Sequence, residues 1–112
     1  MSSAIVRKLD TIQRKGGLRA VDIASLLGMR PETVSRWNQG KASPRPDAER
    51  QILEIAYIID QLADFYEPDE ARLWLNSRQK LLGGQTPFNL IQSGRSGEVI
   101  EMVDQLRDGV FI

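Results

Sequence analysis

The side chains best suited to recognise nucleic acid bases gather in one short stretch of the chain, PETVSRWNQG at residues 31–40. Val34 and Trp37 recur at helical spacing and are expected to face a core, which leaves the polar side chains toward solvent. Arg, Asn and Gln match the hydrogen-bonding edges of guanine and adenine, and Ser and Thr bind bases or phosphates. The candidate DNA-binding residues are Arg30, Glu32, Thr33, Ser35, Arg36, Asn38, Gln39 and Lys41.

Two short helices around Gly28 must position these side chains. Ile23, Ala24 and Leu27 repeat on one helical face before the glycine, and Val34 and Trp37 follow on a second. Apolar residues at this spacing on either side of one glycine predict a helix-turn-helix.

The polar pattern of the second helix leaves an alternative open. The pair of helices could serve only packing or dimerisation, with Glu32 and Arg36 forming an ion pair four residues apart. Arg19 and Arg30 also depart from the usual pattern, since they stand where such helices commonly have a Ser, Thr or Asp cap.

Composition excludes several kinds of chemistry. The 112 residues include no cysteine and no histidine, which removes thiol and imidazole catalysis and the usual zinc ligands. Apolar content of 41% and charged content of 27% are those of a soluble globular protein, and the longest apolar run, Ile55 to Ile59, is too short to span a bilayer. We expect a cytoplasmic protein that is not an enzyme, needs no cofactor or metal and does not insert into a membrane.

Charge divides the chain into unlike halves. Residues 1–50 hold ten Lys/Arg and five Asp/Glu, whereas residues 51–112 hold five and ten, so net charges of +5 and −5 cancel. This asymmetry favours a basic nucleic-acid surface joined to an acidic half with another task.

All predicted elements are helices, so the expected fold class is all-α. A first helix over 3–14 precedes the helix pair, and the Pro-rich connector KASPRP separates a DNA-binding region at 1–45 from a dimerisation and partner-binding domain at 46–112. A long helix is expected from its cap Asp47 to about Tyr66. It is apolar on more than one face, so it either joins the two halves in one core or forms a dimer interface.

Short helices are expected beyond residue 66. One begins at 67–70 with Leu73 and Trp74 toward the core, another follows the cap Thr86 and Pro87, and a last one runs from Ser96 to about residue 107. Gly83 and Gly84 are interpreted as a helix-breaking turn. The apolar chain end at 110–112 either folds back on its own core or enters a partner's cleft.

These features together resemble the Xre/MbcA/ParS type of antitoxin, which is encoded beside RES-domain toxins. The resemblance covers nearly the whole chain, and the second half carries its more specific motifs. These are Trp74, Leu81-Leu82-Gly83-Gly84, Thr86-Pro87, Leu90, Gly94, Glu98-Val99 and Gly109-Val110-Phe111.

The resemblance implies an all-helical, dimeric antitoxin that binds a NAD-consuming RES-domain toxin, covers the toxin's active site with its C-terminal region and represses its own operon. The toxin-binding residues that it implies are Arg95, Gly109, Val110, Phe111 and Ile112. The alternative is a stand-alone transcriptional repressor whose acidic half dimerises or senses a small ligand.

Overall fold

Proline begins four of the helices, as its fixed φ and missing N–H favour at a first helical position. The structure, a computed structural model, describes residues 3–109. Its helices are α1 (Ser3–Gly16), α2 (Ala20–Leu27), α3 (Pro31–Asn38), α4 (Pro46–Leu62), α5 (Pro68–Leu75), the 3₁₀ turn η1 (Lys80–Leu82), α6 (Pro87–Gln92) and α7 (Ser96–Asp108). Within residues 3–109 the only β feature is an isolated bridge between Gln79 and Gln85. The predicted all-α class is confirmed.

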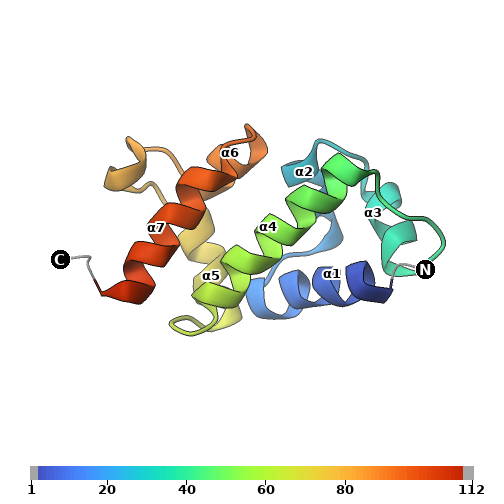
Figure 1. Cartoon of the computed structure of the whole chain (residues 1–112), viewed down its shortest axis with the longest axis horizontal. Coiled ribbons are helices and arrows are strands. Elements are labelled where there is room, and N and C mark those ends of the chain that lie inside the picture. The colour runs from blue at the N-terminus through green and yellow to red at the C-terminus, as the bar shows by residue number, and fades with distance from the viewer. Residues whose placement is uncertain (1–2, 110–112) are drawn as a thin grey trace.

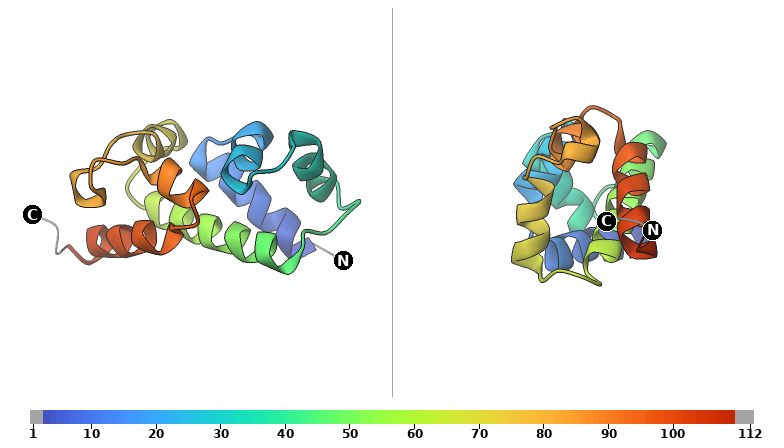
Figure 2. Two further views of the ribbon diagram at one scale, coloured as in Figure 1. Left: turned by 90° about the horizontal axis from the view of Figure 1, so that it is seen from above. Right: turned by 90° about the vertical axis from the view of Figure 1, so that its left-hand side faces the viewer.

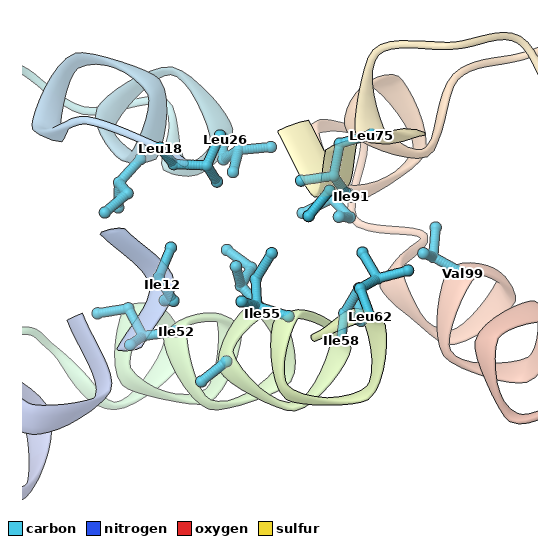
Figure 3. Packing of buried hydrophobic residues seen from close by; sticks show 14 of the residues in the cluster. Ile12, Leu18, Leu26, Ile52, Ile55, Ile58, Leu62, Leu75, Ile91 and Val99 are labelled. Atoms are coloured by element: carbon cyan, nitrogen blue, oxygen red, sulfur yellow. The ribbon is translucent and has the colours of Figure 1, made fainter. Parts of the chain in front are cut away.

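The hydrophobic core is built around α4. Ile52, Ile55, Ile59 and Leu62 on this helix are fully buried, and buried side chains of α1, α2, α5, α6 and α7 lie around it (Figure 3). α1 and α7 pack along α4, while α2, α5 and α6 lie over the side of α4 that faces the core (Figure 1, Figure 2). The long helix therefore joins the two halves in one core, which was one of the two interpretations of its apolar faces.

The molecule is elongated, with extents of 45 × 24 × 22 Å. α3 and the start of α4 lie at one end of the long axis, and the C-terminal end of α7 lies at the other (Figure 1). Surfaces on α3 and on the end of α7 are therefore well separated.

Three local predictions are wrong. The cap residue of α4 is Arg45 with Pro46 at the first position, and not Asp47. The helix ends at Leu62 and not near Tyr66. Residues 63–66 instead form a turn, in which the Tyr66 N–H donates to the Leu62 carbonyl at 2.8 Å. Leu73 is 68% exposed rather than in the core, and Leu75 is buried in its place.

The turns were predicted more closely. Thr86 caps α6, its hydroxyl accepting the Asn89 N–H at 3.0 Å, and Gly83 and Gly84 both have positive φ in a turn after η1. Gly28 ends α2 in the left-handed conformation (φ 67°), which lets the chain turn directly into α3. Of the helices within residues 3–109, none is both long and apolar enough to cross a membrane.

Candidate functional site

Two buried side chains hold α3 in place. Val34 is fully buried and Trp37 nearly so, which fixes the helix against α1 and α2 and turns its other faces outward. The predicted DNA-binding residues accordingly lie at the surface. Arg30, Glu32, Arg36, Gln39 and Lys41 are exposed, and Thr33, Ser35 and Asn38 are half-buried.

The basic residues around α3 form no ion pair with the part of the chain that the structure describes. Within residues 3–109, no ion pair includes Arg30, Arg36, Lys41, Arg45 or Arg50. Glu32 and Arg36 do not pair with each other either, in contrast to the alternative interpretation of this helix. Five cations at one end of the molecule are thus open to an external anion.

The start of α3 has no side-chain cap. Arg30 occupies the cap position with extended backbone (φ −81°, ψ 146°), as its place in the sequence predicted. α2 also begins at an arginine, but there the Asp22 carboxylate accepts the Arg19 backbone N–H at 2.8 Å. The partial positive charge of the α3 N-terminus therefore lies next to the cationic residue Arg30, which favours an approaching phosphate.

An ion pair ties α2 to the second half of the chain. The Arg72 guanidinium on α5 donates to the Asp22 carboxylate at 2.8 Å and to the Gly17 carbonyl at 3.2 Å. Burial alone would raise the pKa of Asp22. The hydrogen bonds from Arg72 and the Arg19 N–H, together with the two guanidinium charges, outweigh burial and hold this pKa below its usual value.

A second contact fastens α2 to α6. The Gln92 side-chain amide donates to the Ser25 carbonyl and hydroxyl, both at 3.0 Å. Sequence reasoning missed both contacts, because their partners lie 50 and 67 residues apart and share no local pattern. The helix pair that carries the predicted DNA-binding residues is thus fixed to the C-terminal half.

Three arginines of the acidic half, Arg72, Arg95 and Arg107, pair with carboxylates of the chain itself, whereas Arg78 is exposed and forms no ion pair within residues 3–109. Arg95, a predicted toxin-binding residue, pairs with Glu98 at 2.7 and 3.0 Å. Arg107 lies within 3.7 Å of Asp104 and donates to the Gln61 side chain at 2.9 Å. Gly109 ends α7 at positive φ. The other predicted toxin-binding residues, Val110, Phe111 and Ile112, lie outside the described residues.

Exposed apolar side chains lie on the C-terminal half. Leu73 lines a recess of about 260 Å³ with Tyr66, Glu70, Trp74 and Ser77. A second recess, of about 230 Å³, lies between η1 and α7 and is lined by Leu81, Leu82, Glu98, Glu101, Met102 and Gln105. Neither recess shows a catalytic arrangement, and both suit contact with the side chains of a protein.

Comparison with known proteins gives these surfaces a context. Residues 61–109 match the model of the antitoxin Xre/MbcA/ParS C-terminal toxin-binding domain. The mycobacterial cidal antitoxin MbcA of Mycobacterium tuberculosis, and that of Mycobacterium bovis, are each 29% identical over 96 residues, covering 86% of this chain and 85% of the relative. A probable mycobacterial cidal antitoxin of M. tuberculosis is 25% identical over 96 residues, and the match covers 86% of this chain and 82% of that relative.

A solved structure extends the likeness to the whole fold. A chain from the crystal structure of the M. tuberculosis MbcT–MbcA toxin–antitoxin complex superposes with a TM-score of 0.86 at 27% identity, and the match covers 100% of both chains. The resemblance to the Xre/MbcA/ParS antitoxins is therefore confirmed.

Proposed function

We propose that this chain binds and neutralises a cognate RES-domain toxin, and that it represses its own operon through α3. The observation that carries the proposal is the full-length likeness to a chain of the MbcT–MbcA complex, together with the family match over residues 61–109. The RES identity of the toxin and its use of NAD come from the family resemblance.

Toxin binding is assigned to the C-terminal half. Phe65, Leu73 and Leu81 are large apolar side chains that remain exposed within the matched domain. Exposed apolar groups beside recesses are typical of surfaces that a protein partner covers. We place the toxin contact here, and we propose that Arg95 and residues 109–112 close over the active site of the toxin.

Deletion of residues 109–112 tests the occlusion. The shortened chain is expected to keep its helical circular dichroism, because α7 ends at Asp108, and to lose protection of cells that express the toxin. A matched control replaces Arg7, an exposed residue of α1 in the other half of the chain, with Ala and should protect fully. Continued protection by the shortened chain would disprove the role of the chain end.

Operator binding is assigned to α3 and its neighbours. The free cations Arg30, Arg36 and Lys41 would hold phosphates or guanine edges, and Asn38 and Gln39 match adenine. A homodimer with two recognition helices needs them about 34–36 Å apart along a palindromic site. Binding should weaken linearly in the logarithm of salt concentration, and salt-independent titrations would exclude phosphate contacts.

The alternative function is a stand-alone repressor without a toxin partner. The exposed cations around α3, which form no ion pair within residues 3–109, favour DNA binding equally under either proposal. A reading frame of RES type beside the gene, whose product copurifies with this chain, would distinguish the antitoxin from the stand-alone repressor.

A further inference from the structure

The recess between η1 and α7 combines exposed and buried apolar side chains. The turn η1 lies beside α7 (Figure 1, Figure 2). Leu81 of η1 is 61% exposed, whereas Leu82 of η1 and Met102 of α7 are buried, and all three line the recess. Its volume of about 230 Å³ is below the roughly 300–1,000 Å³ of small-molecule pockets, so it suits a single side chain of a protein.

The charged side chains that line this recess are both acidic. Glu98 pairs with Arg95 at 2.7 Å, whereas Glu101 is exposed and forms no ion pair within residues 3–109. The cations of the preceding loop, Arg78 and Lys80, are exposed but do not line the recess. The charge that the recess offers to a partner is therefore the Glu101 carboxylate.

The recess adjoins the residues to which toxin contact is assigned above. Arg95, Glu98, Met102, Gln105 and Gly109 follow one another at intervals of three or four residues, so they lie along one side of α7. The first and the last of them belong to the proposed toxin contact, and the other three line the recess. The recess is thus the middle of a surface that runs the length of α7.

The recess on α5 lacks a comparable free charge. The Glu70 carboxylate accepts the Glu67 N–H at 2.8 Å, and the Ser77 hydroxyl donates to the Leu73 carbonyl at 2.6 Å. These polar side chains complete the two ends of α5, whereas Glu101 forms no ion pair within the described residues. Of the two recesses, the one between η1 and α7 is the better suited to a specific contact.

We propose that the recess between η1 and α7 anchors the toxin by receiving one large apolar side chain from a basic segment of the toxin, in which a Lys or Arg within about one helical turn pairs with Glu101. This inference rests on the proposed toxin binding and names the contact that carries it. An apolar side chain in a desolvated pocket supplies affinity, because few residues carry most of the binding energy of an interface. A charge pair at the rim fixes the register of the segment.

Calorimetric titration of the full chain with the RES-type protein encoded beside its gene tests the anchor. Leu81→Ser should raise the dissociation constant about tenfold or more, and Leu81→Met, which keeps size and apolarity, should stay within about threefold of wild type. Far-UV circular dichroism should not change, because Leu81 is exposed. Glu101→Gln should cost about threefold and Glu101→Lys about tenfold, since an exposed ion pair contributes little and like charges repel.

Val21→Ser is the matched control, because Val21 is an apolar side chain of α2 that is 46% exposed in the other half of the chain. Its affinity for the toxin should equal that of wild type. Absence of binding by the wild-type chain would overturn the proposed function and this inference with it. Binding by the wild-type chain that neither Leu81→Ser nor Glu101→Lys weakens would overturn the inference alone.

A photo-crosslink tests the chemistry of the partner segment. Benzoylphenylalanine in place of Leu81 should attach to the toxin on irradiation, and the same group in place of Val21 should not. Mass spectrometry of the attached toxin peptide should find a Lys or Arg within about four residues of the crosslink, which is one helical turn. A crosslinked peptide without a basic residue at that distance would contradict the assigned partner.

Discussion

The basic residues at the two ends of this molecule differ in what they contact. Around α3, Arg30, Arg36 and Lys41 are exposed and form no ion pair within residues 3–109. In the C-terminal half, Arg72, Arg95 and Arg107 each pair with a carboxylate of the chain itself. Arginines engaged in the fold stabilise it, and unengaged ones are open to an external anion. In the proposed function, the unengaged arginines around α3 contact DNA and the C-terminal half contacts a toxin.

The two ends are nevertheless parts of one folded unit. A change at the contact between α1 and α5, which joins the two halves, should have the largest effect on the free energy of unfolding. Gly17 has φ +63°, and an added Cβ would lie 2.7 Å from the Pro68 carbonyl oxygen, a backbone atom that cannot move aside easily. Gly17→Ala is expected to lower the free energy of unfolding by about 2–4 kcal/mol, through strain and through separation of α1 from α5.

Gly28→Ala is the matched control for this experiment. Gly28 has a similar φ of +67°, but an added Cβ would meet nothing within 4 Å. Its cost should be only the strain of the left-handed conformation, about 1 kcal/mol. Urea unfolding measures both variants, and equal losses would show that the contact with Pro68 contributes nothing.

The contrast between free and engaged arginines predicts the next effect. Arg36→Ala should weaken the proposed operator binding by ~1–3 kcal/mol, because no ion pair within residues 3–109 competes for this side chain. Arg95→Ala, which removes an arginine already paired with Glu98, should leave operator affinity unchanged. Fluorescence anisotropy at several salt concentrations provides the measurement. Equal losses in the two variants would remove the distinction between the two ends.

The smallest effect concerns the ion pair between the halves. The pKa of Asp22 is held below its usual 3.8, so its contribution to stability is complete above that pH and is lost as pH falls through the lower, folded-state value. Asp22→Asn should therefore cost about 1–2 kcal/mol at neutral pH, at the modest end for a charged hydrogen bond, because Arg72 is 40% exposed.

The pH profile distinguishes this pair from an ordinary surface contact. Urea unfolding curves of wild type and Asp22→Asn should converge at a pH below the lowered pKa of Asp22, where the wild-type carboxylate is protonated. Asp10→Asn, which breaks an exposed pair with Arg14, should change stability little at any pH. A constant difference between wild type and Asp22→Asn across the pH range would contradict the assignment.

Local signals in the sequence predicted the elements but not how they join. Helical periodicity and the turn at Gly28 predicted α2 and α3, and the uncapped Arg30 followed from its residue type. The early end of α4 at Leu62 and the exposure of Leu73 were not predicted, because alternative apolar residues nearby satisfy the same periodicity. Tertiary packing selected among them.

The candidate site likewise has features that the sequence predicted and contacts that it did not. The surface side chains of α3 followed from Val34 and Trp37 facing the core. The ion pair of Asp22 with Arg72, and the bond of Gln92 to Ser25, join segments that only the folded chain brings together. Residues 110–112, for which the sequence raised an interaction with a partner, stay a prediction.

The central claim is the proposal that this chain carries separate surfaces for a toxin and for DNA on one folded unit. Calorimetric titration of the full chain with the RES-type protein encoded beside it tests this most directly, using wild type and the triple variant Arg30→Ala, Arg36→Ala, Lys41→Ala. The account predicts tight binding with the same dissociation constant for both chains. Absence of binding by the wild-type chain, or loss of binding in the triple variant, would contradict it.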